Sequence, residues 1–145
     1  MSLISPSEAE QFILDHASLL ESESISLENS LGRILRKDLH ADRPFPPFDR
    51  VTMDGITFRH ADYTGAPLKL QGLHPAGSPD PESLKSGHCW QIMTGASLPP
   101  DCDTIVPYEE VEITNDSVTI NCQPEEGIFI HREGSDAPAG TRVLS

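Results

Sequence analysis

Two glycines in this sequence each follow a polar residue that could take part in chemistry. Asp54 precedes Gly55 in a proline-rich stretch, and Thr94 precedes Gly95 after an apolar run. A glycine lets the backbone turn sharply and leaves the preceding side chain uncovered, which is typical of loops that carry functional groups. A carboxylate there can bind a divalent cation or accept a proton. A threonine hydroxyl with neighbouring backbone N–H groups can bind an oxyanion.

Both stretches also have a purely structural interpretation, which is the commoner one for such patterns. Asp-Gly is a frequent turn dipeptide, and a threonine that ends a strand often hydrogen-bonds its own backbone. The prolines before Asp54 favour function slightly, because they stiffen the loop and fix where the carboxylate points. Small residues follow Thr94, and two of them, Gly95 and Ser97, could form an anion cradle with it. They are not a Walker A loop, because the lysine is missing.

A third candidate is Asp136, which follows Gly134 and Ser135 in another loop. Beside Asp54 it would turn one weak cation ligand into a usable pair. Spacing along the sequence does not show whether the two carboxylates meet.

Charge and cysteine content exclude several classes of protein. The net charge is −13, with 23 acidic and 10 basic residues, which disfavours nucleic acid and anionic membranes as partners. The three cysteines, at 89, 102 and 122, form no Cys-x-x-Cys pair, so we expect neither a disulfide framework nor a structural zinc, and we expect a cytoplasmic protein. No apolar run approaches the roughly 20 residues of a membrane span. The acidic neighbours of Cys102 argue against a nucleophilic thiol.

The elements that must position these loops are mainly strands. Ser5, Pro6 and Glu8 predict the capped start of an amphipathic helix whose apolar positions extend to Leu20. Ser26 predicts the start of a second helix, shorter than the first, that carries Leu27, Leu31 and Ile34 and has Gly32 in its middle. Short strands should follow, with a hairpin turning at residues 115–116. We predict a mainly β (α+β) fold: an extended helical arm over residues 1–43, then an irregular barrel-like β domain with coiled or bifurcated sheets over residues 44–145. The strands are expected at 68–73, 88–93, 104–107, 111–114, 117–120, 128–130 and 141–144.

In their order along the chain, these stretches resemble the N-terminal region of the molybdopterin molybdenumtransferase family (MoeA and the gephyrin E domain). The resemblance covers nearly the whole chain, and it is the ordered set of motifs that makes it specific. The matching residues are 27–35, Pro46-Pro47-Phe48-Asp49, Met53-Asp54-Gly55, Asp62, Ala76-Gly77, Gly87, Ile92-Met93-Thr94-Gly95-Ala96, Leu98-Pro99, Asp103, Glu109, Gly134-Ser135-Asp136 and Gly140.

The resemblance implies a function for the complete protein. Members insert molybdenum from molybdate into adenylylated molybdopterin with the help of Mg²⁺, at a site shared between the two subunits of a homodimer. This chain would be the N-terminal part and would supply half of that site. By the resemblance, Asp54, Thr94 and Asp136 are catalytic residues, Asp54 and Asp136 help to hold the metal, and Thr94, Gly95 and Ser97 bind the cofactor. We expect the part alone to be inactive.

The chain also departs from the family pattern at four positions. Val51 replaces a serine, Ile56 an aromatic residue, Ser135 a glutamate and His131 a frequent arginine. We expect each change to remove a charged, hydrogen-bonding or aromatic group from the rim of the site, so a non-catalytic dimerisation or scaffold module derived from the family is the alternative. A β domain with proline-rich loops and no site is the third interpretation.

Overall fold

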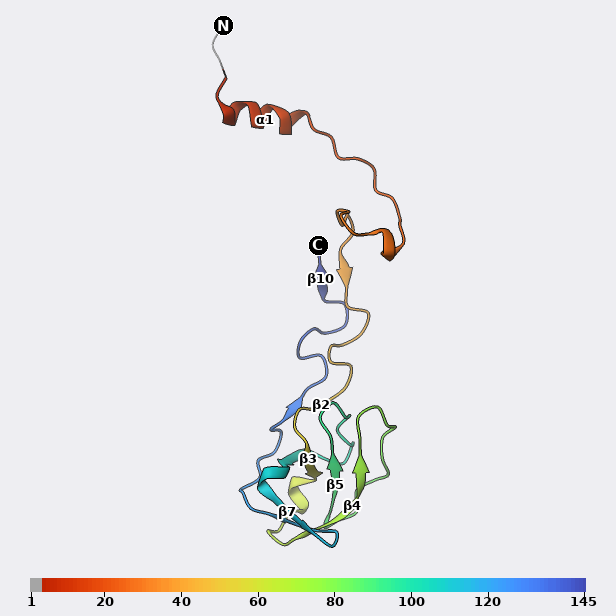
Figure 1. The fold of residues 1–145 in the computed structure, drawn as a ribbon, viewed down its shortest axis with the longest axis vertical. Coiled ribbons are helices and arrows are strands. Elements are labelled where there is room, and N and C mark those ends of the chain that lie inside the picture. The colour runs from red at the N-terminus through yellow and green to blue at the C-terminus, as the bar shows by residue number, and fades with distance from the viewer. Residues whose placement is uncertain (1–3) are drawn as a thin grey trace. The chain divides into compact units, whose positions relative to one another are not determined.

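The computed structural model describes residues 4–145, which divide into two units: residues 4–38 with Ser145, and residues 39–144 (Figure 1). We expected the β domain to begin at residue 44. The second unit begins at Leu39 instead, because β1 (Leu39–His40) pairs antiparallel with β10 (Arg142–Leu144), the last strand in the sequence.

The first helix, α1 (Pro6–His16), begins where the sequence predicts. The Ser5 hydroxyl accepts the Glu8 N–H, and the Glu8 carboxylate accepts the Ser5 N–H, which completes a capping box. The helix ends earlier than the apolar pattern suggested, because Ala17 is extended. None of its described residues is buried within the chain.

The second helix is a single 3₁₀ turn, Leu27–Asn29, so the longer helix expected after Ser26 is wrong. Gly32, in the middle of the expected helix, has a left-handed φ of 79°. A left-handed residue ends a helix, and glycine is the residue that adopts this conformation most readily.

A six-stranded sheet forms the body of the second unit, and it curls like part of a barrel, as the mainly β prediction requires (Figure 1). Its spatial order is β6-β3-β5-β4-β8-β7. Pairing is antiparallel throughout except between β4 and β5, which run parallel. The strands are β3 (Gly55–Phe58), β4 (Leu68–His74), β5 (His88–Ile92), β6 (Thr104–Pro107), β7 (Val111–Thr114) and β8 (Ser117–Ile120).

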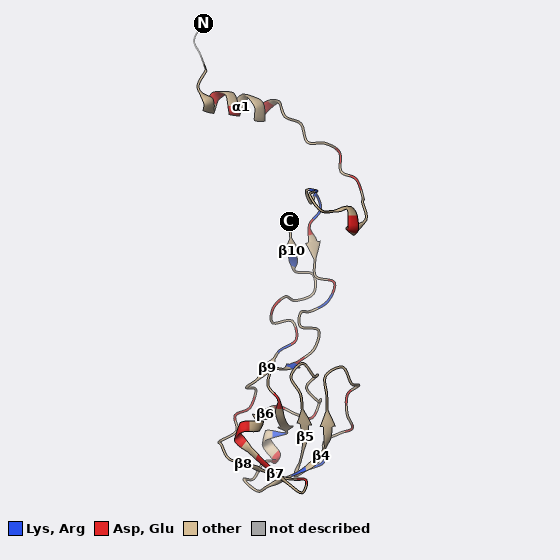
Figure 2. Cartoon of the chain, viewed as in Figure 1, with Lys and Arg blue, Asp and Glu red and all other residues tan. Residues whose placement is uncertain are grey.

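The predicted hairpin is confirmed. Asn115 and Asp116 both have positive φ, 48° and 64°, as a two-residue turn between twisted strands requires. Acidic residues concentrate on the neighbouring 3₁₀ turn Tyr108–Glu110 and on β7, whose side chains are mostly exposed (Figure 2).

The central strand β3 was not predicted, because Asp54-Gly55 reads as a loop tip. Gly55 instead opens β3, and it does not have a positive φ. A Cβ added there would overlap the carbonyl oxygen of Val106 and lie 2.9 Å from Pro107 Cα. The glycine is therefore required by the close approach of β6, and Asp54 lies directly at the start of a buried strand.

Two apolar clusters hold the β domain together. The larger one includes Ile56 and Phe58 of β3, and the smaller one consists of Val51, Ile92, Ala96 and Ile105. The smaller cluster lies under a second short ladder, β2 (Arg50–Val51) paired with β9 (Ile130–His131). This ladder joins the loops that carry the candidate residues.

Candidate functional site

Asp54 and Thr94 lie against each other on the surface of the β domain. Oδ1 of Asp54 accepts the backbone N–H of Thr94 at 2.6 Å, and both residues are exposed. This bond, with a smaller contribution from the Thr94 side chain, lowers the pKa of the Asp54 carboxyl. The carboxylate is therefore ionised at neutral pH, which suits it to bind a cation or to stabilise positive charge better than to act as a base near pH 7.

The Thr94 loop is fixed by the backbone of β2. Gly95 donates its N–H to the Val51 carbonyl at 2.9 Å, and Val51 donates to the Ala96 carbonyl at 3.0 Å. Ala96 is buried, and Gly95 has a φ of 89° that glycine adopts without strain. A buried anchor and two main-chain bonds thus hold the loop rigidly beside Asp54.

The side chain of Ser97 makes hydrogen bonds that are separate from the contact between Thr94 and Asp54. Its hydroxyl donates to Asp80 Oδ1 at 2.9 Å and lies 3.1 Å from Nε2 of the buried His74. It lines a pocket of about 420 Å³ together with Asp49 and Asp80, so two carboxylate residues share the lining with it. An anionic group is disfavoured in that pocket.

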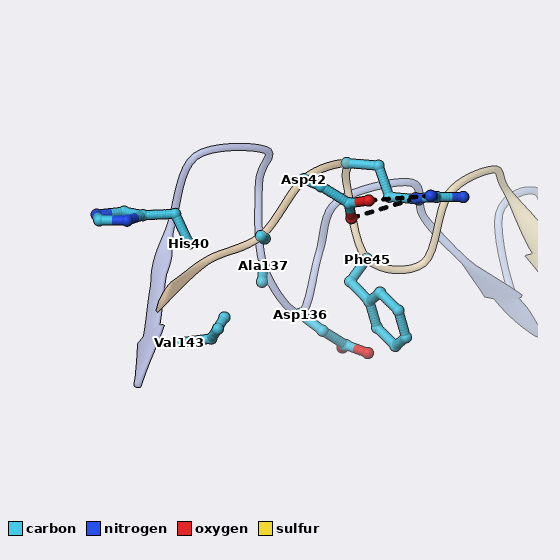
Figure 3. A pocket seen from close by; sticks show the side chains of 8 residues that line it. His40, Asp42, Phe45, Asp136, Ala137 and Val143 are labelled. Atoms are coloured by element: carbon cyan, nitrogen blue, oxygen red, sulfur yellow. Dashed lines mark hydrogen bonds and ion pairs between the residues drawn. The ribbon is translucent and has the colours of Figure 1, made fainter. Parts of the chain in front are cut away.

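Asp136 belongs to a third set of contacts. Its Oδ1 lies 2.8 Å from His131 Nε2, and His131 Nδ1 lies 3.0 Å from Arg50. Asp136 also lines a pocket of about 420 Å³ between residues 40–45 and residues 136–143, where Phe45 is on the facing segment (Figure 3). The backbone N–H of Asp136 donates to the Phe45 carbonyl at 2.9 Å.

Asp49 binds the turn that carries Asp136. Its carboxylate accepts a hydrogen bond from Arg132 Nη1 at 2.5 Å and another from the Glu133 N–H at 2.8 Å. Partial burial raises the pKa of the Asp49 carboxyl, but these two partners outweigh it, and the pKa lies below its usual value.

The structure therefore joins two of the three predicted catalytic residues directly. No hydrogen bond or ion pair within residues 4–145 links Asp136 to Asp54 or Thr94. Residues 49–54 connect all three loops, since this segment contacts residues 94–98 through its backbone and residues 131–136 through the side chains of Asp49 and Arg50. The assignment of Asp54, Thr94, Gly95, Ser97 and Asp136 to a catalytic or binding role stays a prediction.

Four residues of this region escaped the sequence analysis as site candidates. Asp49, Arg50 and His131 belong to the network around Asp136, and only spatial proximity reveals it. Tyr108 follows β6, whose last residue, Pro107, is the register partner of Gly55, and its N–H donates to the Asp54 carbonyl at 3.2 Å. Burial raises the pKa of its phenol, and the nearby Asp54 carboxylate adds to the shift.

Two of the departures from the family pattern have a structural reason. Val51 and Ile56 are 1% and 0% exposed and belong to the two apolar clusters. The expectation that they remove groups from the rim of the site is therefore wrong, because their side chains are packed in the core. At His131, a guanidinium is still present, supplied by Arg50 from the facing strand.

Within residues 4–145, no group of three or more His, Cys, Asp or Glu side chains is arranged to hold a metal ion. Cys89 and Cys102 are buried, and burial raises the pKa of each thiol to about 12, so neither is an available thiolate. In the same described range, no helix combines the length and the apolar character needed to cross a bilayer.

Comparison with known proteins gives consistent matches. The family described as "MoeA N-terminal region (domain I and II)" matches residues 4–145. A molybdopterin molybdenumtransferase of Synechocystis sp. is 37% identical over 146 residues, which cover 98% of this chain and 37% of that protein. Gephyrin of Dictyostelium discoideum is 32% identical over 158 residues, covering 95% of this chain and 22% of that protein.

Solved structures agree with the sequence matches. A crystal structure of the molybdopterin biosynthesis MoeA protein from Pyrococcus horikoshii OT3 has a TM-score of 0.89 at 27% identity, and covers 99% of this chain and 40% of that chain. A second MoeA structure from the same species gives 0.79 at 29% identity, with 99% and 38% covered. The chain thus spans well under half of the length of these relatives.

Proposed function

We propose a function for this chain on one premise: it belongs to the family of the MoeA N-terminal region (domains I and II). Several relatives are molybdopterin molybdenumtransferases by name, which supports a role for the chain in molybdenum cofactor biosynthesis. We propose that it supplies one half of a composite site at which molybdenum from molybdate enters adenylylated molybdopterin. The other half would come from parts of the protein outside these residues.

The observation that carries this proposal is the contact between Asp54 and Thr94. An ionised carboxylate and a threonine hydroxyl, carried by a loop that the backbone of β2 holds, are presented on an exposed surface, and neither residue lines one of the two pockets described above. A rigid polar pair without walls of its own fits one side of a cleft completed by another part of the protein. Thr94 would hydrogen-bond an oxyanion there.

A divalent cation at this site would need ligands beyond those of this chain. Asp54 offers one carboxylate, and Asp136 is held by His131 in a different contact network. Magnesium commonly binds one or two protein carboxylates together with substrate phosphates and water. We therefore assign to Asp54 the role of a single ligand and derive no reaction step through the metal.

The test is molybdenum insertion by the full-length protein carrying Asp54→Asn. The amide is isosteric and still accepts the Thr94 N–H, so the loop should stay in place while the charge is lost. We expect insertion to fall by about 100-fold or more, as for the loss of a preorganised charge at a reacting centre. The matched control is Asp116→Asn in the hairpin turn, where asparagine tolerates the positive φ. Unchanged insertion in Asp54→Asn would refute the role of Asp54.

The homodimer and the cytoplasmic location also remain proposals. The helix α1 exposes Phe12, Ile13 and Leu14 to between 60% and 65%, and contact between subunits would cover such residues. Light scattering of the full-length protein should give a dimer mass. The three free cysteines support a reducing compartment.

The scaffold alternative now depends on Ser135, because Val51 and Ile56 pack in the core. Dimers that bind no magnesium in titrations would favour this alternative.

A further inference from the structure

Arg50, His131 and Asp136 form a continuous chain of side-chain contacts. Arg50 and His131 are register partners across the β2–β9 ladder, and Arg50 Nη2 lies 3.0 Å from His131 Nδ1. On the other side of the ring, His131 Nε2 lies 2.8 Å from Asp136 Oδ1. The side chains of His131 and Asp136 are 29% and 53% exposed, so the chain runs from the half-buried ladder to the surface.

Donor and acceptor chemistry gives this chain a direction. A guanidinium has only donors, so His131 Nδ1 must accept and carries no proton. The proton of the neutral imidazole is then on Nε2, from which it is donated to the Asp136 carboxylate. Arg50 thereby selects the tautomer of His131, and the tautomer orients the carboxylate.

The backbone of the turn at residues 133–136 is held without the side-chain contacts of Arg50, His131 and Asp136, which we call the relay. Gly134 donates to the Pro46 carbonyl at 2.9 Å, Asp136 donates to the Phe45 carbonyl at 2.9 Å, and Asp49 holds the Glu133 N–H. These contacts fix the backbone of residues 133–136. What remains for Arg50 and His131 to determine is the direction of the Asp136 side chain.

We propose that Arg50 and His131 are positioning residues, which hold the Asp136 carboxylate with Oδ1 engaged and Oδ2 left to accept from a bound group. The relevance of this arrangement to catalysis rests on the proposed function, together with the catalytic role that the family resemblance implies for Asp136. The relay itself is a property of residues 50, 131 and 136 and can be tested without any activity.

The first measurement is the tautomer of His131 in the full-length protein labelled with ¹⁵N-histidine, with the signal assigned by its loss in His131→Asn. We expect a neutral ring with the proton on Nε2 and an acceptor Nδ1. A proton on Nδ1 would overturn the proposal. The tautomer itself is read in the wild type, and the substituted protein serves only to assign the signal.

The second measurement replaces the donor. Arg50→Met keeps an unbranched, flexible side chain but removes the N–H groups, whereas Arg50→Lys keeps a donor. In Arg50→Met the ¹³Cγ signal of Asp136 and the His131 ring signals should shift, and Arg50→Lys should restore them in part. Arg36→Met, an exposed site in the first unit, is the matched charge control and should leave both signals unchanged. Unchanged signals in Arg50→Met would overturn the relay.

Molybdenum insertion separates the two proposals. Where the wild type is active, Arg50→Met should lower turnover by about 10- to 100-fold, as the loss of an orienting partner does, with partial rescue by Arg50→Lys. Full turnover in a folded Arg50→Met whose Asp136 signal has shifted would overturn the positioning role. An inactive wild type would instead refute the proposed function, while the Asp136 and His131 signals would still decide whether the relay exists.

Discussion

The backbone N–H of Thr94 donates to Asp54 Oδ1 at 2.6 Å, although 40 residues separate the two in the sequence. Two paired strands bring them together: β3 begins directly after Asp54, β5 ends two residues before Thr94, and Gly55 lies opposite Ile92. The register of two neighbouring strands therefore sets the geometry of the exposed pair, and a third strand, β6, limits which residue can stand at position 55.

The first prediction concerns the ionisation of Asp54. Because the Thr94 N–H stabilises the carboxylate, its pKa should lie below the usual value of about 3.9 when followed by ¹³Cγ NMR. Thr94→Val removes the hydroxyl and keeps the backbone N–H, so most of the shift should persist. A return to the usual pKa in Thr94→Val would mean that the side chain, not the backbone, dominates.

The contact between Asp54 and Thr94 should also make the stability of the folded state depend on pH, in a direction that follows from the lowered pKa. A pKa lower in the folded state contributes stability above the pKa of the unfolded chain and loses it as the pH falls through the folded value. We therefore expect exchange of the Thr94 amide to accelerate below about pH 4, relative to the pH trend of unprotected amides. An unchanged ratio would contradict the assignment of the bond to an ionised carboxylate.

A second prediction concerns Gly55. A methyl group at this position would overlap the Val106 carbonyl oxygen, which belongs to a paired strand and cannot move alone. Gly55→Ala should lower the free energy of unfolding by about 3 kcal/mol, the upper part of the usual range for overpacking. Urea denaturation measures the loss.

The control for this prediction is Gly65→Ala, which meets nothing within 4 Å and is strained only by its φ of 87°. It should lose about 1–2 kcal/mol, the usual cost of a left-handed conformation for a residue with a Cβ. Equal losses at the two positions would show that β6 does not approach Gly55 as closely as described.

The third prediction concerns the cysteines. Burial raises the pKa of Cys89 and Cys102 to about 12, while Cys122 is only partly buried. Because the thiolate is the reacting species, a thiol reagent at pH 8 should modify Cys122 first. Cys122→Ser should abolish the fast phase and leave two thiols that react only on unfolding. A fast phase in that variant would place Cys89 or Cys102 within reach of solvent.

The sequence allowed the local elements to be predicted where side chains alone decide them. The capping box of α1 and the hairpin at Asn115 and Asp116 depend on residues within a few positions of each other, and both are confirmed. The second helix failed because Gly32 takes a left-handed φ, and because, among the described residues of the first unit, none is buried to stabilise a helix by tertiary packing.

The centre of the β domain was hidden for a different reason. β3 is four residues long and buried, and its first residue is a glycine required by contact with β6. β2 has only two residues. The relay from Arg50 to Asp136 crosses 81 positions between Arg50 and His131, and no spacing in the sequence indicates it. Loop convergence depends on strand register, which one sequence does not specify.

The last prediction concerns Asp49, which binds the turn that precedes Asp136 in the sequence. Asp49→Asn keeps the size of the side chain but removes the charge that binds Arg132, so the pair at 2.5 Å should weaken while the Glu133 N–H keeps an acceptor. Both partners are partly exposed, and the cost in unfolding free energy should be only about 1 kcal/mol. Because the pKa of Asp49 is lowered, the difference between wild type and variant should be present at neutral pH and shrink as the pH falls through that pKa. Urea denaturation at pH 7 and near pH 3 measures this, with Asp62→Asn as the control, because Asp62 is a half-buried carboxylate paired with Arg59. A difference that grows in acid would show that Asp49 is not held as a carboxylate in the folded protein.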